Sequence, residues 1–292
     1  EALYVNAVEL VSSGGYHHSN WFFVPAEVAE ERNYKTGTWK NCYKTGFHEI
    51  DAATAGGVVF AQSTQVDREV QKFRDGAVVR IPPNVWIMGS THLLNVYPEP
   101  KDVKLELNLY TIPDEQVAVE LTPFRLSYLD LEIPGESTAA FSTTCNMEKV
   151  YDGQFGYPFD VKIHYMLPHY HALGAGFQVR VVGGEKDGEI IQDFDGYGAD
   201  PFGRLFDPPI ALPGATGLSF TCAFQNPGKK TVGWGIGDQE MCVLLGFMES
   251  PVAFDATVVS GEPVGWKDDT VQHEGDCFVY GFEYPPMGEV EP

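Results

Sequence analysis

The stretch Val103-Lys-Leu-Glu-Leu-Asn-Leu109 alternates apolar and polar residues without a break. This period of two is typical of a half-buried β-strand, because successive side chains of a strand point to opposite faces. The same alternation recurs at residues 129–133 and 177–181, and helical periodicity is limited to a short polar segment at 26–32. The sequence therefore predicts an all-β protein of sandwich or jelly-roll architecture, built from antiparallel strands.

The length of the chain favours two domains. Its 292 residues can bury one large core or two ordinary ones, and typical domain sizes favour the second. Strand-rich runs flank Thr122-Pro123, and the histidines described below fall in two groups on opposite sides of this point. We therefore expect an N-terminal domain at 1–122 and a C-terminal domain at 123–292.

The chain carries a strong negative charge, with 19 basic and 41 acidic residues and a net charge of -22. This charge repels phosphate backbones and anionic lipids, so neither nucleic acid nor a membrane is an expected partner. No apolar run reaches the length of about 18 residues that spans a bilayer. The charge is either a solvated surface or an attraction for a cationic substrate, and the sequence leaves both readings open.

The 5 cysteines lack the C-x-x-C spacing of zinc and redox sites. We expect structural disulfides, which persist in oxidising compartments, and hence a secreted or periplasmic protein. A first residue of Glu1 rather than Met is what a processed chain would show. The odd count leaves one thiol over, which we expect to be Cys42, the only cysteine in the first 140 residues. The lack of an Asn-x-Ser/Thr sequon favours a bacterial source.

Two histidines stand at the spacing i, i+2 in Leu167-Pro-His-Tyr-His-Ala-Leu-Gly174. On a strand, His169 and His171 project from one face and can hold one metal ion. The alternative is two polar side chains on a solvated strand face. The glycines and the alternating strand that follow favour the metal, whereas Pro168 implies a strand edge or a bulge just before the ligands.

A thioether is available at Met241, in Asp238-Gln-Glu-Met-Cys242. A single methionine more often fills a gap in a core. A bridge between Cys222 and Cys242, however, would fix the backbone beside a weak ligand. Imidazole combined with a thioether selects copper, particularly Cu(I). His169, His171 and Met241 therefore form a candidate copper site.

A second candidate site lies upstream, at the adjacent pair His17-His18 and at His92. Consecutive residues of a strand point to opposite faces, so both members of the pair can bind one ion only at a bulge or a strand end. Gly14-Gly15 supplies the needed freedom. Taken alone, His92 is more typical of a buried, hydrogen-bonded core histidine. His48, His164 and His273 are expected to be structural, although His164 is near enough to His169 to support that site.

In combination, these residues resemble the copper type II, ascorbate-dependent monooxygenases, the family of peptidylglycine alpha-hydroxylating monooxygenase and dopamine beta-monooxygenase. That family has a His-His pair and a later His in one domain, followed by H-x-H and a Met in the next. The segment from Cys222 to Cys242 resembles the family's disulfide-bridged segment. Cys145 and Cys277 fit the second bridge of the C-terminal domain.

The resemblance implies two tandem jelly-roll-like domains whose two copper ions face each other across a solvent-filled cleft. It implies that His169, His171 and Met241 form the catalytic, oxygen-activating site. His17, His18 and His92 would form the site that stores and delivers an electron. The implied reaction is hydroxylation of an activated C–H bond with O2, driven by ascorbate or a similar reductant.

Three positions depart from the peptide enzyme of that family. It holds its substrate carboxylate with an Arg before the H-x-H and with an Asn and a Tyr after the Met, whereas this chain has Leu167, Val243 and Leu245. An apolar pocket cannot pair a buried carboxylate. We therefore expect a small neutral or apolar substrate rather than a peptidylglycine.

Two other functions stay open at this stage. One is a secreted copper-binding or electron-transfer protein that keeps both ligand sets without hydroxylating anything. The other is a metal-free β-sandwich module for carbohydrate or protein recognition, in which the histidines are incidental.

Overall fold

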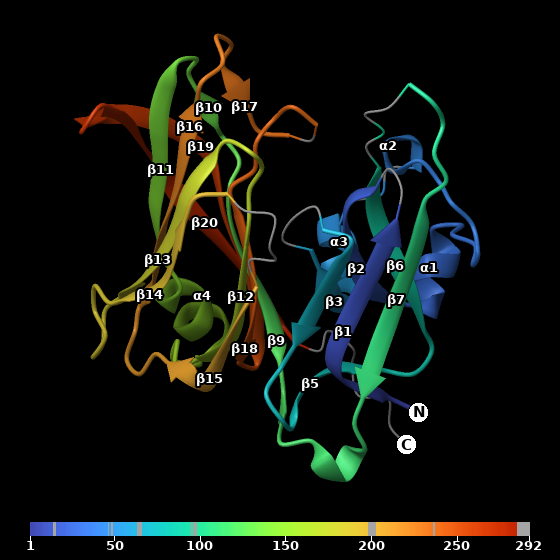
Figure 1. Ribbon diagram of the computed structural model, residues 1–292. Helices are drawn as coiled ribbons and strands as arrows, with labels where there is room; N and C mark the ends of the chain where they lie inside the picture. Colours follow the sequence, from blue (N-terminus) through green and yellow to red (C-terminus); the bar gives the residue numbers. More distant parts are fainter. Residues whose placement is uncertain are drawn as a thin grey trace.

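The computed structural model describes residues 1–284 apart from 14–15, 46, 48, 63–65, 94, 96–97, 198–202 and 236. The chain is all-β, as the alternating pattern predicts, and its strands form several sheets. In Figure 1 the strands up to β7 lie on the right and those from β9 onward lie on the left. The strands before and after Leu121 belong to separate sheets.

The N-terminal half contains two sheets. In the first, β1 (Leu3–Ser13) pairs with β4 (Arg68–Lys72), β5 (Ala77–Ile81) and β7 (Lys104–Thr111), and β8 (Val119–Glu120) extends β5. In the second, β2 (Tyr16–Pro25) lies between β3 (Gly57–Ala61) and β6 (Val85–Leu93). The helices are α1 (Ala26–Glu31), α2 (Cys42–Thr45), α3 (Glu49–Ala55) and the 3-10 turn η1 (Asp114–Gln116). α1 matches the short helical segment expected from the sequence.

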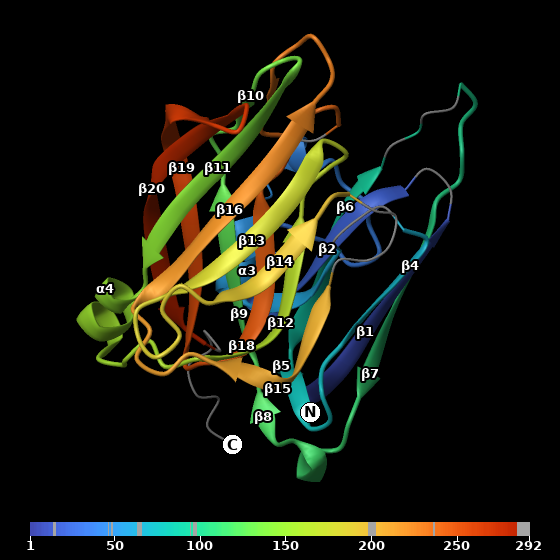
Figure 2. The same cartoon turned by 60° about the vertical axis from the view of Figure 1, so that its left-hand side comes forward.

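The C-terminal half is dominated by one sheet that curls into a near-barrel. Its strands, in spatial order, are β14 (Ile190–Asp195), β13 (Gly174–Val182), β16 (Gly217–Asn226), β11 (Ser137–Asn146), β20 (Thr270–Glu283), β19 (Val252–Lys267), β9 (Thr122–Tyr128), β18 (Val243–Glu249), β12 (Lys162–His169) and β15 (Arg204–Ala211). Figure 2 shows β11, β16, β13 and β14 side by side. A separate pair, β10 (Glu132–Ile133) and β17 (Val232–Gly233), and two short helical turns, α4 (Glu148–Val150) and η2 (Tyr151–Phe155), complete it.

Two of the three alternating stretches are strands and one is not. β7 alternates exposed and half-buried residues, and β13 contains residues 177–181. Residues 129–133, by contrast, do not form the expected continuous strand, because β9 ends at Tyr128 and only Glu132–Ile133 pair again, with β17. Their alternation reflects a chain that leaves the large sheet while Leu131 and Ile133 stay buried. Most pairings are antiparallel, but β5–β8, β11–β20 and β9–β19 are parallel.

Both expected disulfides are present. Cys145 on β11 is bonded to Cys277 on β20, with 5.1 Å between the Cα atoms. Cys222 on β16 is bonded to Cys242, just before β18, with a Cα separation of 5.9 Å. Cys42 lies outside both bridges, as expected.

The two halves share an apolar junction made by β12 and β18. One face of these strands, with Met166 and Leu244, belongs to the C-terminal core. The opposite face supplies Tyr165 and Phe247 to the N-terminal core, where the Phe73 ring lies 6.0 Å and 5.1 Å from theirs between centroids. Burial on both faces explains why β12 is almost continuously buried.

No helix in the described part of the chain is long and apolar enough to cross a membrane.

Candidate metal centre

The first histidine set lies on two paired strands. His18 on β2 stands directly opposite His92 on β6, and their ring centroids are 4.3 Å apart. The β2–β6 register shifts between Tyr16 and His18, so the strand is irregular at His17. This irregularity places the His17 ring 4.6 Å from that of His18, as a bulge at this pair would. The Gly14-Gly15 pair, expected to supply freedom here, lies outside the described residues.

The second set lies at the end of a strand. β12 ends at His169, so His171 lies in the turn that follows and not on the strand, contrary to the sequence-based expectation. The two rings still lie on one side, with centroids 5.3 Å apart, because the intervening Tyr170 is buried in the core on the other side. Gly174 makes room for that ring, since a Cβ there would clash with the Tyr170 side chain.

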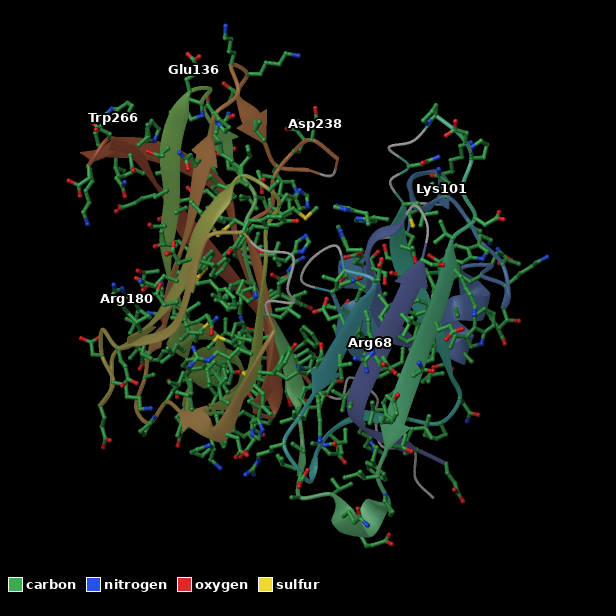
Figure 3. The ribbon with its side chains drawn as sticks, in the orientation of Figure 1. Arg68, Lys101, Glu136, Arg180, Asp238 and Trp266 are labelled. Atoms are coloured by element: carbon green, nitrogen blue, oxygen red, sulfur yellow. A yellow bond between two sulfur atoms is a disulfide. The ribbon has the colours of Figure 1, made fainter. Side chains whose placement is uncertain are left out.

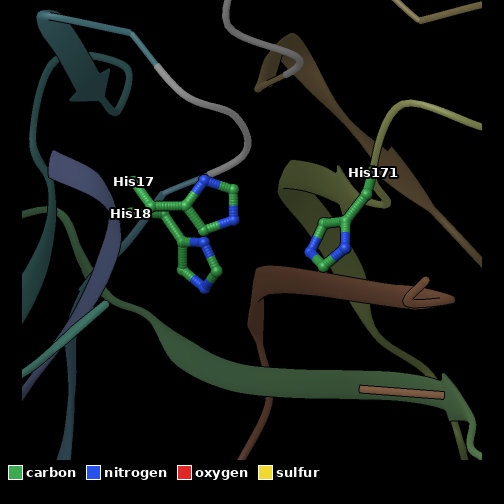
Figure 4. A group of neighbouring side chains, drawn as sticks. All are labelled: His17, His18 and His171. Atoms are coloured by element: carbon green, nitrogen blue, oxygen red, sulfur yellow. The ribbon is translucent and has the colours of Figure 1, made fainter. Parts of the chain in front are cut away.

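The structure brings the two sets together in one cluster of imidazoles. The His18 centroid lies 4.8 Å from that of His169, and His17 lies 5.6 Å from His171. Potential ligand atoms of His17, His18 and His171 all lie within 4.8 Å of one another. Figure 4 shows His17 and His18 side by side, with His171 across from them. The resemblance separates these sets by a solvent-filled cleft, whereas here they are in ring contact.

The hydrogen bonding of His171 leaves one nitrogen available for a metal. Its Nδ1–H donates to the Gln239 carbonyl at 2.7 Å, so Nε2 carries the lone pair. Within the described residues, this buried Nε2 and the buried Nδ1 atoms of His18 and His92 have no hydrogen-bond partner. Such buried, unsatisfied nitrogens fit a site that a metal ion completes.

Burial also favours the neutral, metal-binding form of these imidazoles. It holds the pKa of His18 well below the ordinary 6.5, and the four neighbouring histidines lower it further. Burial likewise lowers the pKa of His92 against the opposing charge of Glu49, and that of His171 against its bond to Gln239. Because a protonated imidazole cannot ligate, these shifts keep the cluster ready for a metal near neutral pH.

Met241 and three of the clustered histidines border a common cavity of about 170 Å³ between the two halves. His18, His92 and His169 line it together with Met241. Figure 3 labels Asp238, on the loop that leads to Met241, at the side of the C-terminal half that faces the N-terminal half. The thioether and three of the imidazoles therefore face one shared cavity.

The walls of this cavity are largely apolar. The three apolar residues noted in the sequence, Leu167, Val243 and Leu245, all line it. The one basic side chain in the described lining besides histidine is Arg125, and Asp255 pairs with both its Nε and Nη2, at 3.2 and 2.6 Å. Because this guanidinium is already paired, the described lining offers no free guanidinium or ammonium group to a ligand carboxylate.

The remaining described histidines lie outside the cluster. The His164 Nε2 bonds Glu249 at 2.8 Å, at the far end of β12, so His164 does not contact the His169 site. The His273 ring stacks on Phe141 at 4.4 Å. His48 lies outside the described residues.

Sequence reasoning missed two residues of this region, Gln239 and Glu240. Gln239 acts through its backbone carbonyl, which no side-chain pattern reveals. Glu240 is a buried carboxylate next to Met241. The one sequence signal for it was its position, directly before a presumed metal ligand and a bridged cysteine.

No family model and no curated protein matches this chain. Among solved structures, it is similar to the VP2 subviral particle of infectious bursal disease virus, with 12% identity and a TM-score of 0.22. A second similar structure, from the Gx strain of that virus, also has 12% identity and a TM-score of 0.22. The alignments cover 84% and 85% of this chain but only 58% and 57% of the viral chains. Similarities this weak carry no argument about fold or function.

Proposed function

We propose that this protein is an extracytoplasmic copper-dependent monooxygenase that hydroxylates an activated C–H bond of a small molecule, with two copper ions per chain. The observation that carries the proposal is the convergence of five histidines beside a cavity that Met241 also lines. They come from β2, β6, the end of β12 and the turn that follows it. Imidazoles with a thioether are a donor set that suits copper. The two disulfides fit an extracytoplasmic location, because disulfides persist in oxidising compartments.

Each ligand set has a distinct proposed task. His169, His171 and Met241 would hold the copper that activates oxygen, because a thioether stabilises Cu(I). His17, His18 and His92 would hold the second copper, since imidazoles alone tolerate both oxidation states. When bound, copper supplies one-electron redox chemistry and the activation of dioxygen, with electrons from ascorbate or a similar external reductant.

The surrounding residues prepare the site for this chemistry. The Gln239 carbonyl orients the His171 ring, and burial keeps the imidazoles neutral. The apolar walls offer water few polar partners in the space next to His169 and Met241. A substrate held there would present a C–H bond to the ligand set.

The cavity supports a small substrate without a carboxylate. Its volume of about 170 Å³ and its apolar walls suit a compact hydrophobic molecule. Leu167, Val243 and Leu245 cannot pair an anion, and Asp255 already occupies Arg125. A peptidylglycine is therefore not the proposed substrate.

Oxygen uptake with copper-loaded protein and ascorbate tests the proposal, using a panel of neutral and carboxylate-bearing C–H donors under labelled O2. We expect uptake stimulated by a neutral donor and label in a hydroxylated product. His169→Ala and Met241→Ala should abolish product, whereas His273→Ala, a buried histidine outside the cluster, should retain it. Uptake that yields only peroxide with every donor would favour a copper-binding or electron-transfer protein instead.

A further inference from the structure

Glu240 occupies an unusual position for a carboxylate. It lies on the loop between β17 and β18, and the residue is only 1% exposed. Its own backbone is fixed, because its N–H donates to the Gly233 carbonyl at 2.9 Å and its carbonyl accepts from Gly235 at 3.0 Å. The side chain is thus held by its loop and points into the protein.

The carboxylate accepts backbone hydrogen bonds from both segments that carry the C-terminal ligands. Oε2 accepts from the His171 N–H at 2.7 Å and from the Met241 N–H at 3.3 Å. Oε1 accepts from the Leu173 N–H at 2.7 Å. His171 and Met241 are far apart in the sequence, and this single side chain ties their backbones together.

These contacts, rather than a cation, partly offset the cost of burying the carboxylate, and burial still raises the pKa of Glu240. Within the described residues no Lys, Arg or His forms an ion pair with Glu240. A buried charge is costly, and an apolar residue of similar volume often serves stability as well or better. What an apolar residue cannot do is accept three N–H groups from two segments in a fixed arrangement.

We propose that Glu240 is a positioning residue that holds the His171 turn and Met241 in register as one metal-binding unit. The Cys222–Cys242 bridge anchors the Met241 segment to β16, and Glu240 ties the same segment to the turn after β12. Its consequence for copper rests on the proposed function, whereas its effect on the two backbone segments does not.

Amide hydrogen exchange in the metal-free protein tests the positioning directly. Glu240→Ala should speed exchange at the His171, Leu173 and Met241 amides by about tenfold or more, because each loses its acceptor. Glu240→Gln keeps the shape and one carbonyl oxygen, so it should restore part of the protection. If Glu240→Ala does not fold, the glutamine variant carries the test, and unchanged exchange at all three amides in a folded variant would overturn the proposal.

Copper binding provides the second readout. Glu240→Ala should lower the affinity for the copper ion assigned to Met241 by about tenfold or more. It should also remove the copper–sulfur signal in X-ray absorption. Glu240→Gln should recover part of both. The matched control is Glu9→Gln, which alters a buried carboxylate that accepts from Arg68, Asn108 and Tyr110 on the N-terminal sheet. It should change neither readout.

The two arms separate this proposal from the proposed function. If the unaltered protein binds no copper, the function fails, and the exchange data alone decide the role of Glu240. If it binds copper and Glu240→Ala binds it equally well with the sulfur signal intact, the function stands and the proposed register between the ligand segments is wrong.

Discussion

The two ligand sets are built in different ways. His18 and His92 face each other across regularly paired strands, and a local irregularity brings His17 beside them. His171 and Met241, by contrast, lie on a turn and a loop. A disulfide and one carboxylate hold these segments in place. The first set is fixed by strand register, whereas the second depends on ties between distant segments, so the two should respond differently to perturbation.

The largest contrast should come from removing each disulfide in turn, by paired Cys→Ala substitutions. The Cys145–Cys277 bridge closes a sequence separation of 132, and its loss should lower the free energy of unfolding by about 4–5 kcal/mol. The Cys222–Cys242 bridge closes a separation of 20, and its loss should cost only about 3 kcal/mol. Yet the variant without the Cys222–Cys242 bridge should release the copper assigned to Met241, because this bridge anchors the Met241 segment. Urea unfolding and copper counting measure the two effects. Equal copper loss in both variants would remove the distinction drawn between the ligand sets.

Phe73→Ala tests the junction that brings the sets together. Phe73 is fully buried against Tyr165 and Phe247, so its truncation should cost about 3–4 kcal/mol. It should also weaken copper binding at both sets, because their contact depends on how the halves pack.

The matched control is Phe159→Ala, a buried ring packed edge-on against Tyr151 inside the C-terminal core. It should lose similar stability while copper affinity stays unchanged. Equal copper loss in both variants would mean that general destabilisation, and not the junction, sets the affinity.

A smaller effect concerns pH. Because burial lowers the pKa of His18, His92 and His171 in the folded protein, the unfolded chain binds more protons below the ordinary value of 6.5. In the metal-free protein, the contribution of these neutral histidines to the free energy of unfolding should be fully present above that pH. It should fall as pH drops, by up to about 1.4 kcal/mol per pH unit for each histidine.

Urea unfolding between about pH 5 and pH 7 isolates the histidines from most carboxylates. His18→Asn should reduce the dependence of the free energy of unfolding on pH, because one titrating group is removed. If the free energy of unfolding of the unaltered metal-free protein did not change over this range, the histidines would not be held neutral by burial.

The sequence predicted the elements better than their assembly. Alternation located β7 and β13, and the resemblance paired the cysteines correctly, because strand periodicity and bridge motifs are local or distinctive signals. It failed at residues 129–133 and at His171, where the chain leaves a sheet while side chains stay buried. Ring contact between the two sets was also unforeseen. The two halves meet where Phe73 packs against strands far along the chain, and no periodicity encodes that contact.

Anaerobic copper titration with metal counting decides whether the histidine cluster is a copper centre. We expect two equivalents per chain, one lost in His18→Ala and the other in His169→Ala, with both retained in His273→Ala. A protein that binds no copper, or whose copper content is the same in all three variants, would contradict the assignment of this histidine cluster as a copper centre.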